Sequence, residues 1–179
     1  IYIADAGNAR IVALSYDQWT NTPSWAFDFG AEHLVNPRGL VYYDNGTENR
    51  NDDLVFVTDI DQSQIVCFTA AGQYVASYGT RGYGYGQLFT PMAICKGPAG
   101  SDWDHTFYVV DKYNFKVCRF TWATNSLFFS SEKLFDEMPR SELCGITTDY
   151  SGFVYVADRA KDRILKLGPN LSLVAVINE

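Results

Sequence analysis

The chain has 179 residues, of which 47% are hydrophobic and 20% are charged, and its formal net charge is −7. This much hydrophobic sequence excludes a disordered chain, and the length suffices for one domain with a sizeable core. The negative charge repels phosphate backbones, and no run of about 18 apolar residues occurs, so we expect neither a nucleic-acid partner nor direct membrane insertion.

The first fourteen residues, IYIADAGNARIVAL, introduce a pattern that recurs three more times. An apolar run ends in aspartate, a short polar turn follows, and a second apolar run begins with a basic or amide residue. The spacings between the aspartates are 54, 52 and 47 residues. Repeats of this period indicate an array of structural units that bury their apolar faces against one another. The four aspartates are Asp5, Asp59, Asp111 and Asp158.

Each copy predicts a β-hairpin, and further short apolar runs flank it. Inner strands are expected over residues 37–43, 91–95 and 143–149, each with a small third residue suited to a crowded axis (Gly39, Ala93, Gly145). Outer strands are expected over 25–29, 73–78, 127–130 and 173–177. Four strands per repeat predict an all-β propeller of four-stranded antiparallel blades. The predicted blades are 1–30, which lacks an inner strand, 35–79, 91–135 and 143–179, with no second domain.

Two passages resemble the NHL-repeat family of β-propellers. The segment GTRGYGYGQLFTP, residues 79–91, resembles the family's glycine-rich G-Q-F-x-x-P connection between blades. Residues 5–11, DAGNARI, are similar to the family's D-x-x-N-x-R-I turn, and the copy at residues 111–117 is a conservative variant. The other two copies depart from it, with Gln62 and Lys161 in place of asparagine. The resemblance implies part of a six-bladed ring within a longer polypeptide, with a closed four-bladed ring as the alternative.

Propeller topology places the repeated turns and the connections between blades on one side, which we call the connection face. The resemblance makes this the usual ligand face of the family. Its candidate contact residues are Arg10, Arg38, Arg81, Tyr83 and Tyr85. We interpret the four aspartates as structural turn residues, because an aspartate that ends a strand accepts hydrogen bonds from turn N–H groups. Residues Arg10, Lys116 and Arg163 share one repeat position, either as partners of those aspartates or as a cationic rim.

The opposite face carries longer insertions, expected over residues 15–24, 44–53 and 96–106. Trp19 and Trp103 lie in two of them, either as a partner surface or as anchors of their own loops. The carboxylates of Asp52 and Asp53 offer a calcium site, but their spacing matches no calcium-loop signature. We therefore predict no metal and no other cofactor.

The evidence for catalysis is thin. His33 and His105 fall on predicted opposite faces, and no nucleophile elbow or zinc motif occurs. The four cysteines suggest either buried free thiols or a disulfide. Asn45 and Asn170 begin glycosylation sequons, which hint at an extracellular or cell-surface protein.

The sequence favours a non-enzymatic module that binds other proteins, or other parts of the same chain, within a larger assembly. A propeller enzyme of the amidating-lyase or lactonase type with an axial metal is the first alternative. An RNA-binding NHL propeller is the second.

Overall fold

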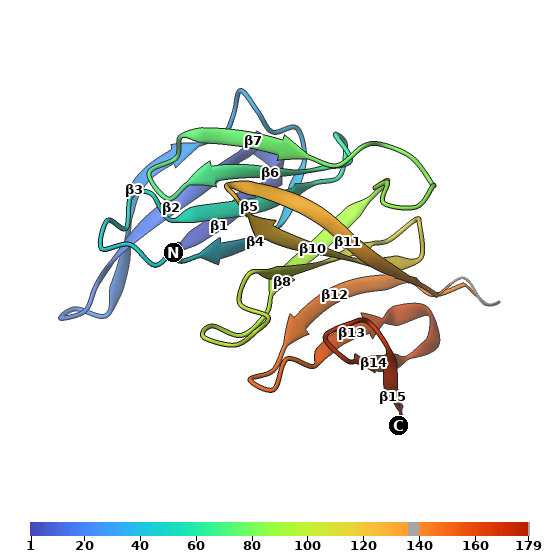
Figure 1. Ribbon diagram of the computed structural model, residues 1–179. Helices are drawn as coiled ribbons and strands as arrows, with labels where there is room; N and C mark the ends of the chain where they lie inside the picture. Colours follow the sequence, from blue (N-terminus) through green and yellow to red (C-terminus); the bar gives the residue numbers. More distant parts are fainter. Residues whose placement is uncertain (136–139, 179) are drawn as a thin grey trace.

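The computed structural model describes residues 1–135 and 140–178, which form fifteen β-strands and two short 3-10 turns (Figure 1). The strands form four separate sheets, and each strand pairs antiparallel with its neighbour in the sequence. This arrangement confirms the predicted all-β class. Glu179, the last residue of the predicted fourth blade, lies outside the described residues.

Each predicted blade corresponds to one sheet. Blade one contains β1 (Tyr2–Asp5), β2 (Arg10–Asp17) and β3 (Thr22–Phe29). Blade two contains β4 (Pro37–Tyr43), β5 (Leu54–Asp59), β6 (Gln64–Thr69) and β7 (Tyr74–Tyr78). Blade three contains β8 (Pro91–Lys96), β9 (Thr106–Asp111), β10 (Lys116–Ala123) and β11 (Ser126–Leu134). Blade four contains β12 (Leu143–Thr148), β13 (Val154–Asp158), β14 (Arg163–Leu167) and β15 (Leu173–Asn178). The turns η1 (Ala6–Asn8) and η2 (Arg159–Lys161) connect the hairpins of blades one and four.

Strand alternation divides the core into three layers, one between each pair of successive blades. In β5, Val55 and Val57 pack toward blade one, whereas Leu54 and Phe56 pack toward blade three. Strand β9 divides its side chains between blades two and four in the same way. Because successive side chains of a strand point to opposite faces, a strand buried on both faces must be apolar throughout, as β5 and β9 largely are.

The inner strands β4, β8 and β12 pack beside one another. A side chain at Gly39 would place its Cβ 2.8 Å from the Cα of Ala93, so the approach of β4 to β8 requires glycine there. At Gly145 the nearest atom to such a Cβ is 3.9 Å away. The expected crowding therefore holds between blades two and three, and Gly145 is free of it.

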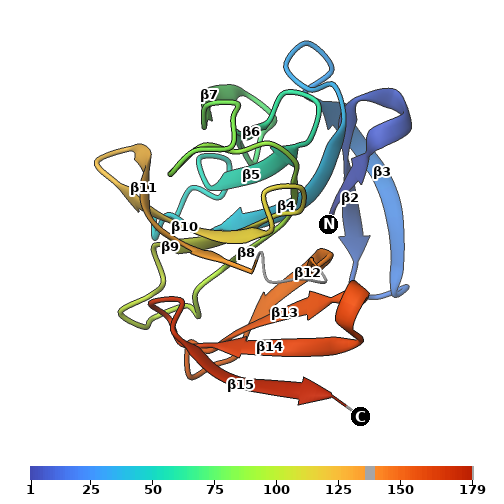
Figure 2. The same cartoon turned by 90° about the vertical axis from the view of Figure 1, so that its right-hand side faces the viewer.

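The four blades form an open arc, which differs from the closed four-bladed ring considered above. Figures 1 and 2 show the sheets in succession, from the blue sheet that holds the N-terminus to the red sheet that holds the C-terminus. The three hydrophobic clusters of described residues join blade one to two, two to three, and three to four. The outer faces of blades one and four expose large apolar side chains, including Ile3, Trp25, Ile164, Val174 and Ile177.

Two elements differ from the predicted boundaries. The expected loop over residues 15–24 is wrong, because β2 continues to Asp17 and β3 begins at Thr22. The hydroxyl groups of Ser15 and Ser24 lie 2.7 Å apart across this extended hairpin. Strand β11 runs to Leu134, beyond the predicted end at residue 130. The described residues contain no long apolar helix of the kind that crosses a membrane.

Candidate functional site

The turn aspartates fix the start of each inner strand on the connection face. Asp59 accepts hydrogen bonds from the backbone N–H groups of the two residues before β4, at 2.6 and 3.0 Å. Asp111 does the same for the two residues before β8, at 3.0 and 2.7 Å, and Asp158 accepts one such bond at 2.9 Å. Asp5 has no inner strand beside it, and its carboxylate accepts from the side chains of Asn8 and Arg10 instead.

The residue three positions after the aspartate holds the preceding connection. The Asn114 amide donates to the carbonyl of Gly82 at 2.9 Å. In blade two, where the family pattern has asparagine, Gln62 donates to the carbonyl of His33 at 2.7 Å. The longer side chain therefore serves the same purpose, and the departure from the motif does not alter the architecture.

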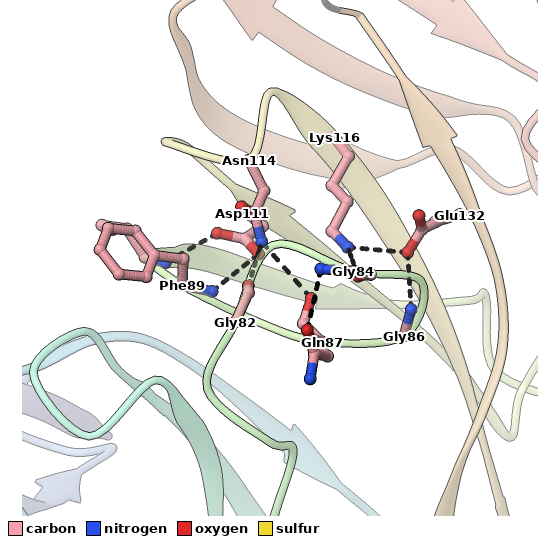
Figure 3. A network of polar contacts seen from close by, with 10 residues as sticks. Gly82, Gly84, Gly86, Gln87, Phe89, Asp111, Asn114, Lys116 and Glu132 are labelled. Carbon is pink, nitrogen blue, oxygen red and sulfur yellow. Dashed lines mark hydrogen bonds and ion pairs between the residues drawn. The ribbon is translucent and has the colours of Figure 1, made fainter.

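The glycine-rich connection, residues 79–90, is fixed to blade three by a buried ion pair (Figure 3). Lys116 Nζ lies 2.8 Å from Glu132 Oε2, and the two side chains are 1% and 9% exposed. Lys116 also donates to the Gly84 carbonyl at 3.0 Å, and Glu132 accepts from the Gly86 N–H at 3.0 Å. Movement of the loop would remove the hydrogen bonds of Gly84 and Gly86 to this buried, charged pair. Because unsatisfied buried charges are costly, these contacts hold the loop in one conformation.

The loop's own residues complete the network (Figure 3). The Gly84 N–H donates to Gln87 Oε1 at 2.9 Å, and Leu88 is fully buried between blades two and three. Gly86 has a φ of 74°, in the left-handed region that favours glycine. Burial raises the pKa of Asp111, while the N–H groups of Thr90 and Phe89 and the Asn114 amide oppose that rise.

This fixed backbone presents aromatic side chains to solvent. Tyr83 and Tyr85 are 72% and 74% exposed. The Tyr83 ring stacks on Phe89 at 4.5 Å between centroids, and Tyr85 meets Phe129 edge to face at 5.0 Å. The Arg81 guanidinium lies 5.3 Å from the Phe89 centroid. Three of the predicted contact residues therefore lie on one loop.

The other basic residues of the connection face are mostly paired. Arg10 contacts Asp5 at 3.0 Å and also pairs with Asp28. Arg163 contacts Asp158 at 2.9 Å. With Lys116 held by Glu132, the shared basic position forms no free cationic rim. Arg38 is exposed and forms no ion pair with any residue that the structure describes.

A second charged group lies at the start of β12. Glu142 contacts Lys112 and Arg159, each at 2.7 Å. Hydrogen bonds from Lys112 and then Arg159 lower the pKa of Glu142. This group links the turn of blade three to the turn of blade four on the connection face.

The two tryptophans of the opposite face differ. Trp19 is 98% exposed at the tip of the β2–β3 hairpin, so it does not anchor its loop. Trp103 is half-buried, lies against Gly152 of blade four, and has the Arg119 guanidinium 5.9 Å from its ring. Trp103 therefore anchors the 97–105 loop on the neighbouring blade.

The carboxylates of the 44–53 loop are engaged within the loop. Asp53 accepts from the Tyr42 hydroxyl and from the Asn45 N–H, and Asp52 accepts from Thr47. Burial and the hydrogen bond to Asp53 raise the pKa of Tyr42 to about 12. The Asn45 amide donates to Asp52, whereas the other sequon residue, Asn170, is exposed in the β14–β15 turn.

Potential metal ligands do not cluster in the described ranges. These ranges contain no set of three or more His, Cys, Asp or Glu side chains that could hold a metal ion. His33 stacks on Tyr74 at 3.9 Å between centroids, and His105 Nδ1 lies 2.5 Å from the Tyr43 hydroxyl. All four cysteines are free thiols: Cys67 and Cys118 are buried, Cys95 is half-buried, and Cys144 is exposed against the expectation.

Three residues essential to this surface were not singled out from the sequence. Glu132 was placed beyond the end of its strand, so its partnership with Lys116 was missed. Asp61 and Tyr113 border the glycine-rich loop. Both stand two positions after a turn aspartate, and this shared repeat position is the signal that would have found them.

Comparison with known proteins identifies the fold. No family model matches the chain, and a search of curated proteins finds no relative. Solved structures are similar over 99% of the chain. A streptogramin B lyase has a TM-score of 0.72 at 16% identity, and a putative 6-phosphogluconolactonase from Bacteroides uniformis has 0.70 at 15%. A virginiamycin B lyase from Staphylococcus aureus has 0.69 at 12%.

The chain has a β-propeller fold. It spans about half the length of these structures, with 50%, 54% and 51% of each covered. At such low identity the similarity shows the fold alone. Membership of the NHL-repeat family and a ring of six blades stay predictions.

Proposed function

We propose that this propeller binds a ligand or partner molecule on its connection face, through the glycine-rich loop. One observation carries the proposal. The loop backbone is fixed by the buried Lys116–Glu132 pair, yet Tyr83 and Tyr85 on that backbone are 72% and 74% exposed. Rigid, exposed tyrosines make good contact residues, because little conformational entropy is lost when a ligand covers them.

An NMR titration tests this function. The ¹⁵N-labelled chain is titrated with neutral oligosaccharides and with proline-rich and acidic peptides, and amide shifts are followed. We expect shifts centred on residues 79–90, lost in the Tyr83→Ala/Tyr85→Ala double variant and kept in Trp19→Ala. Shifts confined to the 44–53 or 97–105 loops would overturn the proposal, as would a double variant that binds like the parent chain.

A propeller enzyme is the second candidate, and the comparisons favour it over a pure scaffold. Two of the similar structures carry the names of lyases, and a third that of a putative lactonase. On the connection face of this chain, the group of Glu142, Lys112 and Arg159 offers a carboxylate between two cations at the start of an inner strand. Such a group supplies cations that stabilise a developing negative charge, while Glu142 stays an ionised carboxylate between them.

Two substrates named with the similar proteins test the enzyme directly. Quinupristin is present in another solved structure of virginiamycin B lyase from Staphylococcus aureus. Conversion of quinupristin and hydrolysis of 6-phosphogluconolactone are measured with the full chain, with and without added divalent cations. Turnover that falls in Glu142→Gln and persists in Tyr150→Ala supports the enzyme. If neither substrate reacts while the loop still binds ligands, the protein is a binding module. In that case we further propose that the ligand is another protein or another part of the same chain, and that the protein is extracellular or lies at the cell surface.

A further inference from the structure

A hollow of about 430 Å³ lies on the connection face beside the glycine-rich loop. It is lined by the β5–β6 turn of blade two, both ends of the glycine-rich loop, and the β9–β10 turn of blade three. Its size falls within the range of small-molecule sites. The lining residues are Ile60, Asp61, Arg81, Phe89, Thr90 and Tyr113.

The side chains around this hollow keep unused polar capacity. Arg81 is exposed and forms no ion pair within the described chain, although its guanidinium lies near the Phe89 ring. Asp61 accepts a single side-chain hydrogen bond, from Asn36 at 3.2 Å. Tyr113 also lines the hollow and is 55% exposed. The Arg81 guanidinium, which donates hydrogen bonds, the Asp61 carboxylate, which accepts them, and aromatic rings therefore border the same hollow.

The backbone of Phe89 and Thr90, which forms one wall of the hollow, is already satisfied. Asp111 takes the N–H groups of Phe89 and Thr90, the Thr90 carbonyl accepts from the Lys112 N–H, and the Phe89 carbonyl accepts from Ser63. A peptide strand that binds by main-chain pairing needs a free strand edge, and this wall offers none. Recognition against this wall therefore uses side chains.

The balance of charges favours a neutral ligand. A carboxylate or phosphate that approached Arg81 would be repelled by Asp61, and a cation would meet the reverse problem. Hydroxyl groups both donate and accept, so neighbouring hydroxyls on one ring satisfy Asp61 and Arg81 together. The apolar C–H face of the same ring packs on an exposed aromatic side chain such as Tyr113.

We propose that this hollow binds a neutral saccharide, with Asp61 and Arg81 hydrogen-bonded to ring hydroxyls and an aromatic side chain beneath the ring. The inference rests on the proposed function and names the ligand class of that face. Tyr83, which is stacked on Phe89, extends the aromatic surface beyond the hollow for a second sugar unit.

Calorimetry with defined oligosaccharides tests the proposal. The full chain is titrated with cellohexaose, laminarihexaose, mannohexaose and maltohexaose, and with an oligogalacturonate and a proline-rich peptide as comparators. We expect at least one neutral hexasaccharide to bind more tightly than both comparators. In Asp61→Asn and Arg81→Ala the affinity should fall about tenfold or more, as for lost hydrogen bonds to charged groups. Tyr150, which is fully exposed on the opposite face, provides the control Tyr150→Ala with an unchanged affinity.

The outcomes separate this inference from the function on which it rests. Binding of the peptide or the oligogalacturonate alone, with shifts at residues 79–90, overturns the saccharide and leaves the binding face intact. If the saccharide affinity is unchanged in both Asp61→Asn and Arg81→Ala, the site lies elsewhere and the inference is also overturned. If no probe binds and no amide on the connection face shifts, both proposals fail. Asp61 and Arg81 are exposed, so the variants are expected to fold, and circular dichroism verifies this.

Discussion

Blades two and three differ from blades one and four in what covers their sheets. Ile65 of blade two and Ile164 of blade four stand at the same repeat position, six residues after the turn aspartate. Ile65 is fully buried, whereas Ile164 is 38% exposed. The sequence repeats, but the environment does not, because a blade's faces are buried by its neighbours and not by its own strands.

Polar groups show the same contrast. Lys116 of blade three and Arg10 of blade one share a repeat position, and each pairs with a carboxylate on the outer strand of its blade. The Lys116–Glu132 pair is almost completely buried, whereas the side chains of Arg10 and Asp28 are 37% and 36% exposed. The same ion pair is thus a fixed support in the middle of the arc and a surface contact at its end.

The largest expected effect separates these two ion pairs. Glu132→Ala leaves a buried ammonium group without its partner and should lower the free energy of unfolding by about 3–5 kcal/mol. Asp28→Ala should lower it by less than about 1 kcal/mol, since exposed pairs contribute little. Urea unfolding monitored by fluorescence measures both. Equal losses would contradict the contrast between the blades.

The two matched isoleucines give the next effect. Ile65→Ala creates a cavity between blades two and three and should destabilise by about 2–5 kcal/mol. Ile164→Ala removes a partly exposed side chain and should cost less than about 1 kcal/mol. Both variants are made in the 179-residue chain and compared by the same urea unfolding measurement. A large loss at Ile164 would show that another surface covers blade four.

Thiol reactivity compares the buried middle blades with the exposed end blades, without a mutation in the core. Burial raises the pKa of Cys67 and of Cys95 to about 12, and it also raises the pKa of Cys118. Cys144 is exposed on blade four. A thiol reagent at neutral pH should therefore modify roughly one thiol per native chain, because reaction needs an accessible thiolate. Cys144→Ser should abolish the fast phase, and rapid labelling of all four thiols would argue against buried middle blades.

The smallest effect concerns the boundary between blades three and four. Lys112 and Arg159 lower the pKa of Glu142 below its unfolded value. Its contribution is therefore complete above the unfolded pKa of about 4.3 and is lost as the pH falls through the folded pKa. The difference in stability between the parent chain and Glu142→Gln should be constant near neutral pH and shrink below about pH 4. A difference that grows on acidification would show the opposite shift.

The repeated motif was enough to predict the blades, because turn aspartates and apolar runs are local features with a regular spacing. The two strands of the β2–β3 hairpin were predicted, but their extension into residues 15–17 and 22–24 was not, because Asn21 and Pro23 are typical turn residues. There the two strands continue past the predicted turn, joined by the Ser15–Ser24 contact. Tertiary pairing outweighed local propensity at this point.

The candidate site was predicted only in part. The exposure of Tyr83 and Tyr85 could be predicted, because each stands between glycines in a connecting loop. The support by Glu132 did not follow, because it depends on the strand that lies beside Lys116. Likewise, the hollow joins Asp61 to Tyr113, two residues that only the packing of one blade against the next brings together.

Each sheet consists of strands that are consecutive in the sequence, and every strand of the described residues belongs to the sheet of its own repeat. All main-chain pairing within a blade is thus complete once its last strand has left the ribosome. The blades can then form in the order in which they are synthesised, and each completed blade provides the apolar face against which the next blade packs. Such a molecule gains length by adding one unit at a time, with no earlier pairing to undo.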